Sequence, residues 1–150
     1  MPQDYLASAT NVQALIGLEQ LRQWPENVRH RRTLTGFYLE SLHTLGVDIA
    51  PLKIGSNEPN LWAIPLLVDN KREILSIAGR RGLPIATWFD RTPVHVNAAT
   101  ASRYDYRPGQ CPQSEQMFSR EIHLSTAPWV TLDLAERTIQ LLKQHARLAY

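Results

Sequence analysis

Residues 106–115 read Tyr-Arg-Pro-Gly-Gln-Cys-Pro-Gln-Ser-Glu, and residues 122–129 read Ile-His-Leu-Ser-Thr-Ala-Pro-Trp. The Pro-Gly pair in the first stretch is a turn signal. Pro112 suits the first helical position, where its missing N–H leaves no hydrogen bond unmade. Glu115 then lies near the positive end of the helix dipole, which favours a carboxylate. The two stretches therefore predict a turn, a helix that ends near Arg120, and a short strand over 122–125.

Apolar residues recur at helical spacing through residues 9–45 in two successive stripes. Pro25 falls between the stripes, so the pattern predicts either two helices or one helix kinked near Trp24. Gly46 suits the position that follows the last helical turn. The chain is therefore expected to begin with helical structure that ends at this glycine.

Strand-like and loop-like segments alternate after Gly46. Val47–Leu52 reads as a short strand, and Lys53–Pro59 reads as a loop rich in turn formers. Asn60–Val68 is too short and too apolar for a surface helix and predicts a mostly buried strand. Because proline cannot donate to a strand ladder, Pro65 predicts an edge position or a bulge for that strand.

A helix and another strand are expected next. Asp69 can cap a helix over 70–81 that Gly82 closes, and Leu83–Trp88 should form the following strand. Phe89–Asp105 shows no periodicity and is expected to be a loop, whereas Thr131 can cap a last helix. The order of elements predicts an α+β fold with a small, mainly antiparallel sheet covered by helices. We expect one domain over residues 1–150, with leading helices in 9–45 and an α/β part in 46–150.

Composition excludes several classes of function. The net charge of +2 is too small to indicate a nucleic-acid partner or an acidic membrane surface. Cys111 is the single cysteine, which excludes an internal disulfide, and the five histidines lack the paired spacing of metal ligands. No apolar run approaches the roughly 20 residues that span a bilayer. We therefore expect a soluble, cytoplasmic protein that binds no metal.

The motifs resemble one enzyme family in order and spacing. The Gly-x-Cys-Pro-x-x-Glu turn and helix, the Leu-Ser strand, the Pro-Trp pair and the last helix are similar to the C-terminal part of the DegT/DnrJ/StrS-type aminotransferases. Residues 12–21 resemble the helix that leads into that family's small domain, and Arg29–Leu42 resembles its Arg-rich helix. The resemblance implies the C-terminal domain of a fold-type-I, pyridoxal-phosphate enzyme that aminates nucleotide-linked keto sugars.

The resemblance also implies that this chain lacks the catalytic half of the enzyme. The cofactor forms a Schiff base with an activated lysine, and none of Lys53, Lys71 and Lys143 lies in a segment like the family's Ser-x-x-x-Lys loop. The positions that correspond to the family's Asn-aromatic-Arg element are about Leu6-Ala7-Ser8 here, and they hold neither Asn nor Arg. No catalytic or cofactor-binding residue is therefore assigned, and pyridoxal phosphate is not expected to bind this chain alone.

Two residues resemble positions near the family's substrate mouth, where an aromatic–Pro turn is followed by a histidine. They are Trp88 and His95, although packing and solvation are the common roles of such residues. Two functions stay open for the chain. It is either an aminotransferase part that is inactive without a large catalytic domain, or a non-catalytic interaction module of the same fold.

The partner expected of either form is a large domain or a second copy of the chain. Leu18, Trp24, Trp62 and Trp129 are candidates for the apolar surface that such a partner would cover.

Overall fold

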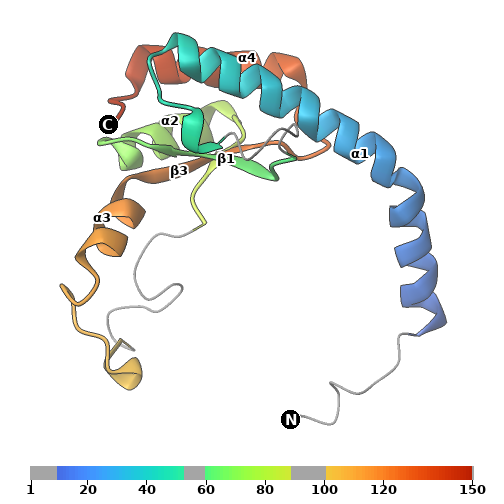
Figure 1. Ribbon diagram of the computed structural model, residues 1–150, viewed down its shortest axis with the longest axis horizontal. Helices are drawn as coiled ribbons and strands as arrows, with labels where there is room; N and C mark the ends of the chain where they lie inside the picture. Colours follow the sequence, from blue (N-terminus) through green and yellow to red (C-terminus); the bar gives the residue numbers. More distant parts are fainter. Residues whose placement is uncertain (1–9, 53–59, 89–100, 150) are drawn as a thin grey trace.

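The computed structural model describes residues 10–52, 60–88 and 101–149. Within these residues a three-stranded sheet has helices packed on one of its faces (Figure 1). The elements in chain order are α1 (Asn11–Thr44), a 3₁₀ turn (Ala50–Leu52), β1 (Ala63–Leu67), α2 (Lys71–Arg81), β2 (Ile85–Ala86), a second 3₁₀ turn (Ala101–Tyr104), α3 (Pro112–Arg120), β3 (Glu121–Ser125) and α4 (Leu132–His145). The predicted α+β class, with a small antiparallel sheet covered by helices, is confirmed.

The leading segment is one helix with Pro25 inside it, which is the second of the two arrangements that the sequence allowed. A capping box starts α1: the Gln13 N–H donates to Thr10 Oγ1 at 3.3 Å, and the Thr10 N–H donates to Gln13 Oε1 at 2.8 Å. Proline removes one helical hydrogen bond and favours a kink. The two halves of α1 run in different directions in Figure 1, so only the second half lies over the sheet.

The sheet has the strand order β1-β3-β2, and both pairings are antiparallel. Strand β3 is therefore central, and β1 and β2 run parallel to each other on either side of it. Pro65 lies in the edge strand β1 opposite His123, as the missing N–H of proline predicted. Helix α2 connects β1 to β2 and crosses on the side that holds the core.

The hydrophobic core lies between the sheet and three helices. Alternation along the strands turns Ile64, Leu66, Ile122 and Leu124 toward the helices, and each is buried. The facing helical residues are Leu34, Tyr38 and Leu42 of α1, Ile74 and Ala78 of α2, and Ala135, Leu141 and Leu142 of α4. None of the described helices combines the length and the apolar character needed to cross a bilayer.

Two sequence predictions are wrong, and each has a local physical reason. Residues 47–52 form no strand, because the Ala50 N–H donates to the Asp48 carboxylate at 2.9 Å and the chain turns there. Asp69 does not cap α2; its carboxylate pairs with Arg120 at 3.0 Å, and Asn70 takes the N-cap position. The predicted loop over 53–59 and most of the predicted loop over 89–105 lie outside the described residues.

The predicted turn, helix and strand around Pro112 are confirmed. Pro112 is the first residue of α3, Gly109 has a φ of 91°, and β3 follows α3 directly. Thr131 caps α4 by accepting the Leu134 N–H at 3.2 Å. The expectation of a single domain over residues 1–150 stays a prediction.

Candidate functional site

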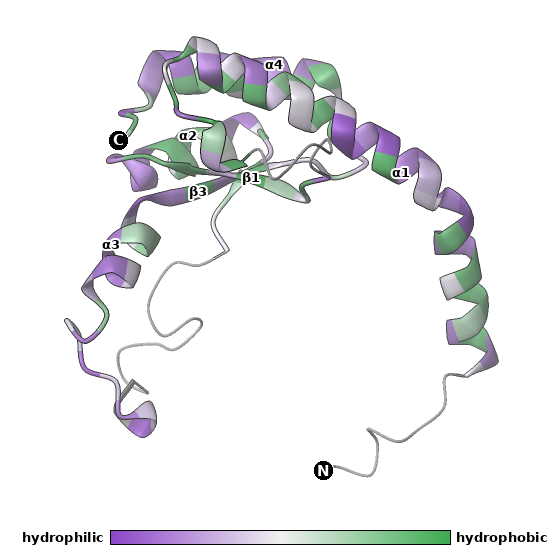
Figure 2. Ribbon diagram, viewed as in Figure 1, coloured by the Kyte–Doolittle hydropathy of each residue, from purple (hydrophilic) through white to green (hydrophobic). Residues whose placement is uncertain are grey.

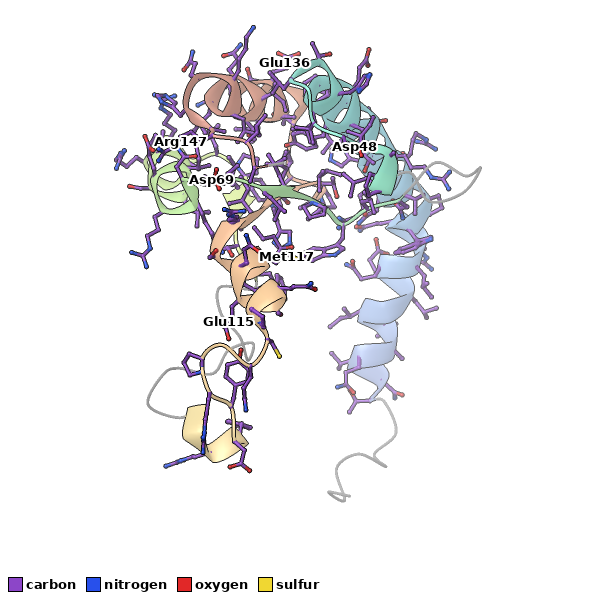
Figure 3. All side chains as sticks on the ribbon, turned by 60° about the vertical axis from the view of Figure 1, so that its left-hand side comes forward. Asp48, Asp69, Glu115, Met117, Glu136 and Arg147 are labelled. Carbon is purple, nitrogen blue, oxygen red and sulfur yellow. The ribbon has the colours of Figure 1, made fainter. Side chains whose placement is uncertain are left out.

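The face of the sheet turned away from the core helices is the candidate site. On this face, His123 in the central strand is flanked in register by Pro65 of β1 and Ala86 of β2, and both flanking residues are exposed. Figure 3 shows Glu136 of α4 on one side of the sheet, with Met117 and Glu115 of α3 on the other. The first half of α1 projects past the same side of the sheet as α3 in Figure 1. Two arms of the chain thus project beyond this sheet face.

A buried ion-pair geometry lies at the base of this face. His123 and Glu121 alternate onto the same side of β3, and His123 Nε2 is 3.1 Å from Glu121 Oε1. Their side chains are only 10% and 8% exposed. The other carboxylate oxygen, Glu121 Oε2, is buried and accepts no hydrogen bond from the described residues. Buried polar groups are normally paired, so the unpaired oxygen lowers the stability of the fold. The contact through Oε1 orients the imidazole of His123.

Two tryptophan rings meet beside this pair. The rings of Trp62 and Trp88 are edge to face, with centroids 5.1 Å apart and planes at 84°. The Trp62 ring also lies 5.8 Å from the imidazole of His123. The structure thus places the predicted site residue Trp88 next to Trp62, which the sequence predicted only as part of an apolar surface. His95, the other predicted site residue, lies outside the described residues.

The Pro-Gly-x-Cys-Pro-x-x-Glu segment is held together by Glu115. The Tyr106 hydroxyl donates to the Glu115 carboxylate, and the Gly109 N–H donates to the same oxygen at 2.7 Å. Desolvation, together with the hydrogen bond and the charge of Glu115, raises the pKa of Tyr106 to about 12. Hydrogen bonds from Tyr106 and Gly109 lower the pKa of Glu115. These contacts tie the turn to the start of α3, which is a structural role.

The described lysines do not fit a pyridoxal phosphate site. Lys71 borders a pocket of about 710 Å³, but it is 8% exposed and its ammonium donates to the Phe118 carbonyl oxygen at 2.6 Å. A Schiff-base lysine must instead offer its amine to an aldehyde. Lys143 is exposed in the last turn of α4, and Lys53 lies outside the residues that the structure describes. Within the described ranges, no three His, Cys, Asp or Glu side chains gather into a metal site.

The first half of α1 is a second bare surface. Hydrophobic residues recur along this half of the helix in Figure 2. Each is more than half exposed, and they are Val12, Leu15, Ile16, Leu18, Leu21 and Trp24. A helix with apolar residues around much of its circumference is normally buried. This half of α1 is therefore built to be covered by something other than the described core.

The fold and its bare surfaces define an α+β module whose core helices cover one face of the sheet. The chain belongs to the DegT/DnrJ/EryC1/StrS aminotransferase family, whose sequence profile matches residues 7–143. An uncharacterized protein of Methanocaldococcus jannaschii is 25% identical over 136 residues, which cover 86% of this chain and 34% of that protein.

Two solved structures share the fold. A DegT DnrJ EryC1 StrS aminotransferase from Brucella abortus matches with a TM-score of 0.68 and 21% identity, covering 89% of this chain and 35% of that one. S. venezuelae DesV in complex with a ketimine intermediate matches with a TM-score of 0.67 and 19% identity, covering 96% and 40%. The chain therefore spans little more than a third of the length of these relatives.

Proposed function

We propose that this chain is the C-terminal small-domain part of a pyridoxal-phosphate-dependent aminotransferase that acts on nucleotide-linked keto sugars. The observation that carries the proposal is the family match over residues 7–143, made by a chain that spans about a third of its relatives. The cofactor supplies amino-group transfer when it is bound in the rest of the fold. This chain would supply one wall of the substrate site.

The bare half of α1 supports a partner for the chain. Six large apolar side chains stand exposed between Val12 and Trp24, and large exposed apolar patches mark interaction sites. The remaining part of the family fold is the occupant that we propose, whether it belongs to the same polypeptide or to another. A second copy of the chain is the other partner that would cover the same residues.

The alternative function is a non-catalytic interaction module of the same fold. The observation that favours it is the exposed apolar half of α1, which can bind a partner without any catalytic group. In that case the chain would associate through α1 and carry out no amino transfer.

A cofactor-trapping experiment tests whether the chain acts alone. The purified chain is mixed with pyridoxal phosphate, treated with borohydride and digested for mass spectrometry. We expect no specific adduct on Lys53, Lys71 or Lys143 and no amino transfer. A stoichiometric adduct on one lysine, with amino transfer by the chain alone, would contradict the proposal.

A graft tests whether the chain works as part of the enzyme. Residues 10–149 replace the matching third of the Brucella abortus relative, and amino transfer from glutamate to nucleotide-linked keto sugars is measured. We expect activity from the graft and loss of activity with Leu18→Glu on the bare half of α1. The matched control is Gln140→Glu on the exposed side of α4, which should retain activity. A folded graft that shows no amino transfer would favour the interaction module.

A further inference from the structure

The sheet face turned away from the core helices presents a corner made of two tryptophan rings. Trp62 precedes β1 and Trp88 follows β2, and their rings meet near the central strand β3, where the Trp62 ring lies beside His123. The ring planes stand at 84°, and each residue remains 54% exposed. A tryptophan that closes a core is mostly buried. These two rings therefore keep a large apolar surface available to a ligand.

Buried groups support the corner from behind. The imidazole of His123 lies 5.8 Å from the Trp62 ring, tilted by 40°, and its Nε2 is held by Glu121 at 3.1 Å. Ala86, which pairs with His123 in register, is exposed and has only a methyl side chain. The small side chain of Ala86 extends little from the sheet, and the buried pair limits the movement of the Trp62 ring.

A flat heteroaromatic ring is the ligand that suits this geometry. Nucleobases stack on aromatic side chains with little dependence on their hydrogen-bonding groups. Aromatic rings also favour edge-to-face contacts, so a base stacked on one indole can meet the other indole with its edge. A free sugar presents hydroxyl groups that each require a hydrogen-bond partner.

We infer that Trp62 and Trp88 bind the nucleobase of the nucleotide-linked substrate. The inference rests on the proposed function, which supplies the nucleotide. It adds Trp62 as a binding residue and makes His123 and Glu121 positioning residues for its ring. The corner lies on the face toward which α3 and the first half of α1 project, and ligand sites often lie at such boundaries between parts of a fold.

The four indole N–H groups of the chain provide the test. Nitrogen-labelled chain is titrated with uridine and thymidine diphosphates into the millimolar range, with inorganic pyrophosphate and a free hexose as separate arms. We expect the signals of Trp62 and Trp88 to shift with both nucleotides. The signals of Trp24 and Trp129 serve as internal controls and should stay in place.

Substitutions make the result specific to the corner. Trp62→Leu should weaken nucleotide binding by roughly 10-fold or more, because it removes a stacking surface, whereas Trp62→Phe should keep most of the affinity. Trp129→Leu, at a residue that is also exposed, should change nothing. Unmoved signals for Trp24 in every variant, and for Trp129 in the two Trp62 variants, confirm that the chain is folded.

Three results would overturn the inference: no shift with nucleotides, equal shifts of all four indoles, or the same shifts with pyrophosphate or hexose alone. The grafted enzyme separates this inference from the proposed function. Nucleotide binding at the corner in a folded graft that transfers no amino group would refute the proposed function alone. Amino transfer with an unchanged KM in the Trp62→Leu graft would refute the corner alone.

Discussion

Replacing His123 with leucine should destabilise the fold, because the change leaves the Glu121 carboxylate buried without its partner. The two side chains are 10% and 8% exposed, and Nε2 and Oε1 are 3.1 Å apart. The second oxygen of Glu121 already accepts no hydrogen bond within the part of the chain that the structure describes. After the substitution, Oε1 would lose the contact that now offsets its burial.

The magnitude follows from the degree of burial. Removing one partner of a buried pair costs about 3–5 kcal/mol, and so little exposure leaves little screening by solvent. We expect the lower end, about 3 kcal/mol, because leucine fills most of the space of the imidazole. For a chain of this size that corresponds to a fall in Tm of about 6–12 °C. The double variant His123→Leu, Glu121→Leu should recover most of the loss, since an apolar pair of similar volume is tolerated.

Urea unfolding of the native chain, both single variants and the double variant measures these differences. The matched control is His43→Leu, an exposed histidine in the last turn of α1, which should stay within about 0.5 kcal/mol of the native chain. A cost below about 1 kcal/mol for His123→Leu would refute the reasoning. A double variant no more stable than that single variant would refute it as well.

Three further predictions concern the scaffold. The pKa of Tyr106 is raised to about 12 by desolvation and by Glu115, so Glu115→Gln should lower the midpoint of its tyrosinate absorbance; an unchanged midpoint contradicts the contact. Burial raises the pKa of Tyr38 from 10.0 to about 12, so this residue favours folding below pH 10. Its contribution to stability should disappear as the pH rises through 12. Tyr38→Phe should remove that pH dependence from urea unfolding curves. Thr131→Ala should cost about 1 kcal/mol by removing the cap of α4, and Thr131→Asn should retain most of it; equal stabilities would show that the cap contributes nothing.

Local signals in the sequence predicted the elements that depend on a few neighbouring residues. Pro112 and Gly109 define the turn and the first turn of α3, and Gly82 ends α2 in the left-handed region with a φ of 62°. Such signals are local because they arise from the allowed φ values of single residues and from nearby N–H groups. The edge position of Pro65 followed from the same kind of reasoning.

Competing contacts account for the predictions that failed. Asp69 has a side chain suited to an N-cap, but Arg120 from the end of α3 pairs with its carboxylate. Asn70 then takes the cap position, and its amide donates to Glu73 at 2.7 Å and to the His145 carbonyl at 2.8 Å. A sequence does not show which of two neighbouring polar residues a distant side chain will engage.

The sequence by itself determined the family, the α+β class and the turn, helix and strand around residues 106–125, because those depend on local backbone preferences and on the order of motifs. Only the tertiary structure decided which surfaces stay bare and which side chains meet. Trp62 and Trp88 lie at the ends of strands that flank β3, so their meeting depends on strand pairing between distant segments. The bare half of α1 has a different cause: the helix changes direction at mid-length, and only its second half reaches the core.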